Sequence, residues 1–368
     1  MLITILITGS SGFLGKNLCS HLSQRKDIVL KTFDLENSLE ELKEYTNCVD
    51  TIFHLAGVNR PEKIEDFETG NAELTQTLLN FVRESNRKPH IIFSSSIQAE
   101  LDNPYGKSKR IAEQILEDAA QKEEIKLSIF RLTNLFGKWS RPNYNSVTST
   151  FCYNIANDLP IQINDSDYSF DLAYVDDVIT AFVKEMTEQP KRNGYHVEVS
   201  AIPCKNITVG ELAEQIRFFH EMQTTLLIPD FSDRFNQQLY ATYLSYLPKE
   251  RWEYGTEIKT DHRGNLAELI KSKFFGQMFV SKTKPGITRG NHYHHTKTEK
   301  FMVMSGKAVI RFRHIHATEI IEFPVNGDDY RIVDIPPGYT HSITNTGTTE
   351  LITLFWSSEI FDTNKLDT

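Results

Sequence analysis

A glycine-rich turn near the N-terminus constrains the fold more than any other feature of this 368-residue chain. Residues 2–7 form an apolar run rich in β-branched side chains, which is typical of a strand buried on both faces of a parallel sheet. Three glycines at every third position and a helix-forming segment follow. Glycine lets a pyrophosphate approach the backbone, and the helix start offers N–H groups to the anion. We therefore predict a dinucleotide site at Gly9, Gly12, Phe13, Leu14 and Gly15.

An acidic residue follows the second predicted strand, residues 28–33. Asp34 lies about 20 positions beyond the last glycine, where a dinucleotide-binding fold places its ribose ligand. A carboxylate accepts hydrogen bonds from the ribose diol and repels a 2′-phosphate, so Asp34 favours NAD over NADP. The alternative is a solvated loop aspartate that takes no part in binding.

Strands and helices alternate beyond this point. Residues 49–55 and 90–93 are predicted strands, and residues 66–84 have helical periodicity. This alternation predicts an α/β domain with a doubly wound parallel sheet of the Rossmann type. Small residues at the end of the third strand let the adenosine lie against the backbone, so the predicted cofactor site also includes Leu55, Ala56 and Gly57.

Tyr105 and Lys109 stand four residues apart, and on a helix they share one face. A phenol with a pKa near 10 is a poor acid at neutral pH, but a neighbouring ammonium lowers that pKa by favouring the phenolate. A serine at a strand end then shares the substrate oxygen, with Ser96 as the candidate and Ser95 as the alternative. We predict that Ser96, Tyr105 and Lys109 form a catalytic set.

These motifs resemble the extended short-chain dehydrogenase/reductase family, whose members modify nucleotide sugars, and the resemblance covers residues 1–247. It implies that Tyr105 transfers a proton at the substrate carbonyl or hydroxyl and that Lys109 also holds the nicotinamide ribose. Asn134 resembles the asparagine of the family that contacts the substrate. The polar loop that follows is either solvated or binds the nucleotide diphosphate, through Lys138, Arg141, Tyr144 and Asn145.

The last third of the chain has a different sequence pattern. Short β-prone segments alternate with glycine and proline turns, which predicts an all-β sandwich or barrel. The pattern of the first part breaks around residues 248–255. We therefore predict a reductase domain over residues 1–247, a linker over 248–256 and a β domain over 257–368.

Four metal-ligating side chains lie within this β-rich part. His292 and His294 alternate along a predicted strand, so both project to one face, which in a small barrel is the interior. Glu299 on the next strand and His341 on a distant one complete a shell of three histidines and one carboxylate. This set suits zinc and also accepts manganese, iron or nickel, so we predict a divalent metal site, with zinc first.

The segment resembles the cupin family, a jelly-roll barrel whose two motifs match residues 286–306 and 336–345. The usual leading glycine of the second motif falls at Tyr330, and we expect this departure to alter a turn. Residues 261–265 resemble sugar-nucleotide epimerase cupins, which often work without metal through a histidine base and a tyrosine acid. The complete ligand set argues against a purely metal-free mechanism here. Candidate acids and bases are His295, Lys297, His314 and Tyr339.

The order of the two halves, with segments such as DNPYGKSK, KPGITRGNH and HHTKTEKF, resembles the CapF family of bifunctional capsular polysaccharide enzymes. The resemblance implies that the cupin part epimerises C-3 of a UDP-4-keto-6-deoxy amino sugar. The reductase part then reduces the C-4 ketone, giving UDP-2-acetamido-2,6-dideoxy-L-talose or a close isomer. It also implies NADPH as cofactor, against the preference of Asp34, and a homodimer. Two alternatives are a single-function reductase with a structural, dimerising cupin and a non-enzymatic nicotinamide sensor.

Composition excludes several other classes. The net charge of −9 argues against a nucleic-acid-binding surface. No apolar stretch approaches the ~20 residues of a membrane span, and the N-terminus lacks the basic segment of a signal peptide. We therefore expect a cytoplasmic protein without membrane insertion. The four cysteines show no C-x-x-C pair and are expected to be reduced and structural.

Overall fold

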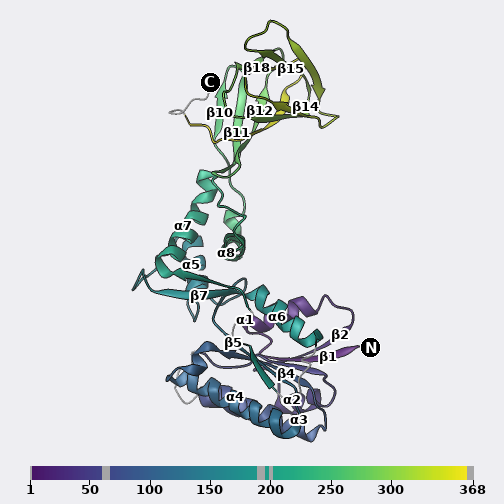
Figure 1. Cartoon of the computed structure of the whole chain (residues 1–368), viewed down its shortest axis with the longest axis vertical. Helices are drawn as coiled ribbons and strands as arrows, with labels where there is room; N and C mark the ends of the chain where they lie inside the picture. The colour runs from purple at the N-terminus through teal and green to yellow at the C-terminus, as the bar shows by residue number, and fades with distance from the viewer. Residues whose placement is uncertain (1, 60–66, 189–194, 199–201, 363–368) are drawn as a thin grey trace. The chain divides into compact units, whose positions relative to one another are not determined.

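The computed structural model describes residues 2–59, 67–188, 195–198 and 202–362, and it divides into two compact units (Figure 1). The N-terminal unit comprises Met1–Ile216 and Gln238–Leu247, and the C-terminal unit comprises Arg217–Gln237 and Pro248–Thr368. We had assigned all of residues 1–247 to the first domain, whereas 217–237 groups with the second unit. The backbone of this segment bonds to a strand of that unit, since the Lys271 N–H donates to the Leu226 carbonyl at 2.8 Å and the Ile228 N–H donates to the Lys271 carbonyl at 2.8 Å.

A parallel six-stranded sheet with the strand order β2-β1-β3-β4-β5-β8 forms the centre of the N-terminal unit. The chain winds outward from β1 in one direction and then returns to build the other half. The strand order therefore reverses between β1 and β3, and ligands of such sheets bind at the carboxyl ends of the strands beside that point. The strands are β1 (Ile3–Thr8), β2 (Ile28–Phe33), β3 (Thr51–His54), β4 (His90–Ser96), β5 (Leu127–Leu132) and β8 (Tyr195–Glu198).

Helices cover both faces of this sheet, as Figure 1 shows. One face packs against α2 (Leu39–Thr46), α3 (Leu74–Glu84) and α4 (Pro104–Glu123). The other packs against α1 (Phe13–Leu22) and α6 (Val175–Glu188). The strands are apolar on both sides because each face lies against a layer of helices.

Shorter elements complete the N-terminal unit and the connection between the units. A small sheet has the order β6-β7-β9, with strands Asn134–Phe136, Ser169–Tyr174 and Cys204–Thr208. Short turns of helix are η1 (Glu68–Glu73, a π-helix), η2 (Ile97–Glu100) and η3 (Lys249–Arg251). The remaining helices are α5 (Val147–Ala156), α7 (Val209–Thr225) and α8 (Arg234–Leu244).

Two antiparallel sheets face each other in the C-terminal unit and share one apolar core. Buried residues of both sheets meet in that core, for example Phe301 and Phe355 from one sheet and Phe312 and Ile343 from the other. The first sheet has the order β10-β11-β12-β19-β14-β17, with strands Ile258–Asp261, Gly264–Ser272, Gly276–Thr283, Leu351–Ser357, Glu299–Ser305 and Ile332–Ile335. The second has the order β13-β18-β15-β16, with strands Thr288–His292, Tyr339–Asn345, Lys307–His314 and Ile321–Asn326.

The predicted fold class is confirmed, because a helix-covered parallel sheet precedes an antiparallel β unit. At Tyr330, where the second motif usually has a glycine, φ is +47°, in the left-handed region that glycine adopts freely. The expectation that this departure alters a turn stays a prediction. In the described residues, we find no helix with the length and apolar character to cross a membrane.

Candidate functional site

The glycine turn after β1 has the close backbone packing that a phosphate cradle needs. Gly9 has φ at +70°, and a Cβ there would lie 2.6 Å from the backbone nitrogen of Ala56. A Cβ on Gly15 would lie 2.1 Å from the Gly9 carbonyl oxygen, so only glycine lets α1 begin this close to the turn. Within the described residues no side chain caps α1 at Gly12, so the helix start presents its N–H groups and positive dipole end to an anion. The turn therefore fits a pyrophosphate.

A cavity of about 720 Å³ lies at the carboxyl ends of β1, β3, β4 and β5, beside the reversal of strand order. It brings together most of the residues predicted for the cofactor and the chemistry. These are Gly9, Gly12, Phe13, Leu14, Gly15, Leu55, Gly57, Ser96, Tyr105 and Lys109. The size and the glycine-lined wall fit a nicotinamide dinucleotide.

Two predicted cofactor residues sit behind the cavity wall. The Asp34 carboxylate accepts a hydrogen bond from the Ser11 N–H at 2.6 Å and a second from the Leu35 N–H at 2.9 Å. The carboxylate therefore lies against the glycine turn, where we predicted the ribose ligand. Ala56 supports Gly9 through its backbone, and its N–H donates to the Thr8 hydroxyl at 3.2 Å.

Lys109 is 5% exposed and points from α4 into the strand ends. Its ammonium donates to the Ser94 carbonyl at 3.0 Å and lies 4.9 Å from the centroid of the Phe93 ring. Burial lowers the pKa of Lys109 to about 8, although the nearby Glu113 carboxylate raises it. The ammonium therefore loses its proton just above neutral pH.

Tyr105 lies on the same face of α4, with its ring 5.8 Å from the Phe67 ring. We expected Lys109 to lower the pKa of this phenol. Instead burial raises the pKa of Tyr105, and a hydrogen bond with Ser96 offsets part of that rise. The phenol is therefore the protonated form at neutral pH, which suits a proton donor.

The loop after β3 is held by residues that our sequence analysis missed. Asn71, on the π-helix η1, accepts from the Val58 N–H at 3.1 Å and donates to the Val58 carbonyl at 2.9 Å and the Ser108 hydroxyl at 3.0 Å. A Cβ on Gly57 would lie 2.6 Å from the Asn71 carboxamide oxygen. An isolated asparagine on an otherwise apolar helical face is the one sequence signal for it.

The substrate side of the cavity is built by the segment after β5. Asn134, Arg141 and Asn145 line it, whereas Lys138 is not among the lining residues and instead pairs with Asp176 at 2.8 Å. Tyr246 supports this segment, since its hydroxyl donates to the Ser140 carbonyl at 2.6 Å. Tyr144 of the same loop also lines the cavity, and lining residues outside the predicted set include Val58, Asn59, Gln98 and Trp139.

The four predicted metal ligands converge in the C-terminal unit. Their ligand atoms all lie within 4.8 Å of one another, and His294, Glu299 and His341 are buried. The Glu299 carboxylate lies 3.4 Å from His294 Nε2 and 3.3 Å from His341 Nε2. Ligands of tetrahedral zinc stand about 3.4 Å apart, so the set fits a divalent metal.

Electrostatics suit a cation at this cluster. Burial raises the pKa of Glu299, but hydrogen bonds from His294 and His341 outweigh it and bring that pKa to about 2. Burial, with the neighbouring His341 and His294, lowers the pKa of His292 to about 4. A carboxylate and a neutral imidazole are the protonation states that bind metal.

The route by which these ligands converge differs from the prediction. We placed His292 and His294 on one strand, but β13 ends at His292, and an irregularity at Asn291, with φ at +66°, precedes it. His294 therefore reaches the cluster from a turn. Its ring lies 4.9 Å from that of His292, so the two ligands meet without strand alternation.

The candidate acids and bases of this unit separate into two groups. Tyr339 packs on the apolar core, and its ring lies 5.0 Å from the His314 ring on the paired strand. Tyr339 and His341 are two residues apart on β18, so both project to the interior face. His295 is exposed and Lys297 is partly buried, both in the turn before β14.

Comparisons with known proteins agree with both units. The model of the NAD dependent epimerase/dehydratase family matches residues 5–199, and that of the polysaccharide biosynthesis C-terminal domain matches residues 259–368. The chain is 45% identical to the UDP-2-acetamido-2,6-beta-L-arabino-hexul-4-ose reductase of Pseudomonas aeruginosa, over 99% of this chain and 97% of that protein. It is 26% identical to an Escherichia coli dTDP-4-dehydro-6-deoxyglucose reductase, over 58% of this chain and 81% of that protein.

A solved structure extends the likeness across the whole chain. The capsular polysaccharide assembling protein CapF of Staphylococcus aureus superposes with a TM-score of 0.91 at 44% identity, covering 99% of this chain and 98% of that one. The chain therefore belongs to the family of CapF, in which a domain of the NAD dependent epimerase/dehydratase family precedes a polysaccharide biosynthesis C-terminal domain.

Proposed function

We propose that the chain is a bifunctional nucleotide-sugar enzyme of surface polysaccharide biosynthesis. Its C-terminal unit epimerises C-3 of a UDP-4-keto-6-deoxy-N-acetylhexosamine, and its N-terminal unit reduces the C-4 ketone with NAD(P)H. The product is UDP-2-acetamido-2,6-dideoxy-L-talose or a close isomer. The observation that carries the reductase half is the meeting of Ser96, Tyr105 and Lys109 in one cavity with the glycine turn.

The residues of the N-terminal unit account for the proton side of the reduction. A bound nicotinamide supplies the hydride for C-4. Tyr105 keeps its proton at neutral pH and donates it to the developing alkoxide, and Ser96 hydrogen-bonds the same oxygen. Lys109 places a positive charge next to that oxygen, which stabilises the charge that develops during hydride transfer.

A UDP-sugar is the proposed substrate because of the cavity and the relatives. Arg141 and Asn145 line the cavity and offer hydrogen-bond donors to a diphosphate. The Pseudomonas aeruginosa relative is named for a UDP-linked 4-ketohexose. Asp34 beside the turn favours NADH, whereas the family resemblance favours NADPH.

Epimerisation removes the proton on C-3, which the adjacent ketone acidifies, and returns a proton to the opposite face. The candidate groups are His295, Lys297, His314 and Tyr339. The interior position of Tyr339 and its packing on His314 favour these two, because a base must reach the carbon inside the barrel. A metal at the histidine cluster, when bound, supplies Lewis-acid stabilisation of the ketone oxygen.

One observation favours a second function, a reductase with a structural cupin. The cluster offers four protein ligands, and a tetrahedral zinc with four protein ligands is typical of structural sites, whereas catalytic zinc keeps one position open. In this alternative the metal stabilises the β unit, and the substrate arrives already epimerised.

Hydrogen exchange separates the two functions. The UDP-4-keto-6-deoxy-N-acetylhexosamine is incubated with the protein in D2O without nicotinamide, and C-3 is followed by NMR. Deuterium at C-3 is expected, and NAD(P)H is then consumed once it is added. Prompt NAD(P)H consumption without exchange would support the single-function reductase.

We further propose a homodimer, as the resemblance implies. Strand β10 lies at the edge of its sheet, and all four of its residues are exposed, including Ile258. An open strand edge pairs readily with another chain. Light scattering should give twice the 42.4 kDa mass of one chain, and a monomer across the micromolar range would contradict this proposal.

A further inference from the structure

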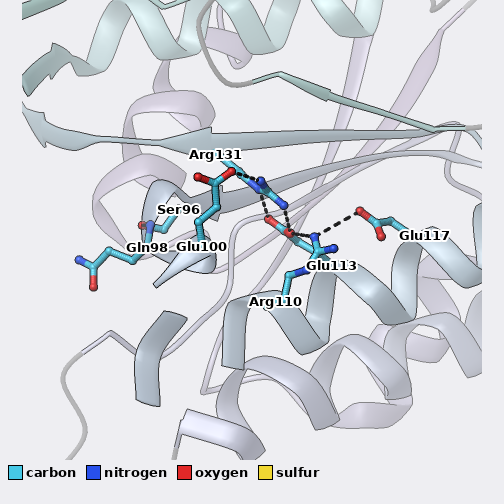
Figure 2. A network of polar contacts seen from close by, with 7 residues as sticks. All are labelled: Ser96, Gln98, Glu100, Arg110, Glu113, Glu117 and Arg131. Atoms are coloured by element: carbon cyan, nitrogen blue, oxygen red, sulfur yellow. Dashed lines mark hydrogen bonds and ion pairs between the residues drawn. The ribbon is translucent and has the colours of Figure 1, made fainter. Parts of the chain in front are cut away.

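An ion-pair network centred on a buried carboxylate joins α4, β5 and η2 (Figure 2). Its centre is Glu113, a fully buried carboxylate on α4. The Arg131 guanidinium donates to both carboxylate oxygens, from Nε at 2.9 Å and from a terminal nitrogen at 2.7 Å. Arg110 donates to the same carboxylate at 2.8 Å. A buried charge with this many bonds needs an explanation, because removing charges from water is costly.

The network joins the elements that carry the chemistry. Arg131 lies on β5, one residue before the strand ends and three before Asn134, and it reaches Glu113 on α4. Its other terminal nitrogen donates at 2.7 Å to Glu100, the last residue of η2. Figure 2 shows Arg131 between these two carboxylates. One guanidinium therefore ties the helix of Tyr105 to the turn that follows Ser96.

The joint between α4 and η2 is tight at a second point. Ser96 is the N-cap of η2, and its hydroxyl accepts from the Gln98 N–H at 3.2 Å. A Cβ on Gly106 would lie 2.1 Å from the Gln98 carbonyl oxygen. A small shift of α4 therefore changes the distance between the Tyr105 and Ser96 hydroxyls.

Glu113 also faces Lys109 along the helix, one turn away. In the part of the chain that the structure describes, the other groups that β3, β4 and α4 place around the ammonium supply no negative charge at working pH. From β3, His54 is neutral, because burial lowers its pKa to about 3. From β4 come the neutral Ser94 carbonyl and Phe93 ring. From α4 itself, Tyr105 keeps its proton. The Glu113 carboxylate is thus the negative charge identified as acting on Lys109.

We propose that Glu113 is a positioning residue of the N-terminal site: it clamps α4 to β5 and η2 through Arg131 and keeps the Lys109 side chain charged. The first role rests on the ketone reduction proposed above. The second does not, since Lys109 lines the cavity whether or not a ketone is the substrate. Burial raises the pKa of Glu113, but hydrogen bonds, led by those from Arg131, hold it below its ordinary value, so the clamp is charged at neutral pH.

The test compares Glu113→Gln with a matched control, Glu117→Gln. Glu117 lies one turn further along α4 and faces the same Arg110 at 3.7 Å. Its charge acts on Arg131 only at longer range, since no hydrogen bond or ion pair joins the two in the described residues. Two readouts are taken from pH 6 to 10: the affinity for NADH or NADPH by nucleotide fluorescence, and kcat and KM for reduction of the UDP-4-keto sugar. Thermal unfolding checks that each variant is folded.

Loss of the carboxylate lowers the pKa of Lys109, because the attraction that raised it is gone. The ammonium is present below that pKa and lost above it. Burial brings the pKa of Lys109 to about 8, so this group should set a basic limb of nucleotide binding and of kcat. That limb should move to lower pH by about one unit in Glu113→Gln. Its kcat should fall about 10- to 100-fold with KM within about twofold, and Glu117→Gln should match the unmodified protein.

If the basic limb of the pH profile and the kcat of Glu113→Gln both match those of Glu117→Gln, the proposal is wrong. If kcat falls but the basic limb stays at the same pH, Glu113 does not keep Lys109 charged. If Glu113→Gln does not fold, Glu113→Asp carries the test: the charge remains, so the limb should stay, while the shorter side chain should lower kcat at least about fivefold. Full activity in Glu113→Asp would contradict the clamp. If the unmodified protein reduces no ketone, the proposed function fails, and the binding limb still tests the effect on Lys109.

Discussion

The two candidate sites differ in how their side chains are brought together. In the N-terminal unit, Tyr105 and Lys109 are one helical turn apart, and a buried ion-pair network fixes their helix to the strand ends. In the C-terminal unit, the ligands come from β13, a turn, β14 and β18, and meet across about 50 residues of sequence. The first site is prearranged by the fold, whereas the second is a cluster of three histidines and a carboxylate that fits a divalent metal.

The two sites should therefore respond differently to single substitutions. The cavity holds its groups by packing and ion pairs, so single changes there should alter chemistry more than stability. The cluster holds the Glu299 carboxylate against two imidazoles, so changes there should alter stability and metal content first.

The largest expected effect breaks the chemistry of the first site alone. Tyr105→Phe removes the proposed proton donor and should lower the rate of ketone reduction about 10³-fold, with nucleotide binding and thermal unfolding unchanged. NAD(P)H oxidation measures the rate. Tyr45→Phe is the control, because Tyr45 lies on α2, packs partly buried against the apolar core and does not line the cavity. Survival of the reductase rate in Tyr105→Phe would show that the assignment is wrong.

The next effect breaks the second site. Glu299→Gln keeps the shape of the side chain but removes the charge that the histidines share. Zinc content after dialysis should fall, and the unfolding free energy of the β unit should drop by about 3 kcal/mol.

Its control is Glu322→Gln, since Glu322 is an exposed carboxylate that pairs with Arg311. Metal analysis and calorimetry give the two readings, and nucleotide binding should be unaffected. Equal zinc content in both variants would mean that the cluster does not bind the metal.

A smaller effect tests the glycine turn. Gly15→Ala places a methyl group where 2.1 Å separates its Cβ from the Gly9 carbonyl oxygen. The backbone must shift, which should weaken nucleotide binding by about 1–3 kcal/mol. Gly255→Ala is matched to it, because a Cβ on Gly255 meets nothing within 4 Å. Fluorescence titration with NADH distinguishes the two, and equal affinities would argue that the turn does not approach the nucleotide.

The smallest effect sharpens the choice of cofactor. Asp34→Asn removes the negative charge beside the turn while keeping a group that accepts from the Ser11 N–H. The ratio of kcat/KM for NADPH over NADH should rise about tenfold, or 1.4 kcal/mol. Glu36→Gln, an exposed neighbour, is the control. An unmoved ratio would place the 2′-position away from Asp34.

The sequence was sufficient where the chemistry is local. Tyr105 and Lys109 were predicted from helical spacing, and the parallel sheet from alternating strands and helices. Glu113 and Arg131 were missed because they are 18 residues apart and become partners only when β5 and α4 pack together. The grouping of residues 217–237 with the C-terminal unit was missed for the same reason, as it depends on backbone bonds to Lys271.

The histidine cluster shows an intermediate case. Its four residues were predicted, but through strand alternation that the irregularity at Asn291 removes. The residue types of the motif therefore identified the cluster correctly, although regular strand alternation did not predict the local backbone geometry. The expectation that Lys109 lowers the pKa of Tyr105 was likewise wrong, because burial of the phenol raises that pKa.

The most direct test of two independent sites uses Tyr105→Phe with the UDP-4-keto-6-deoxy-N-acetylhexosamine in D2O, followed by NMR at C-3. The account predicts that deuterium enters C-3 at the rate of the unmodified protein while NAD(P)H is not consumed. Exchange that disappears with the reductase activity would contradict it, because both reactions would then depend on the N-terminal site.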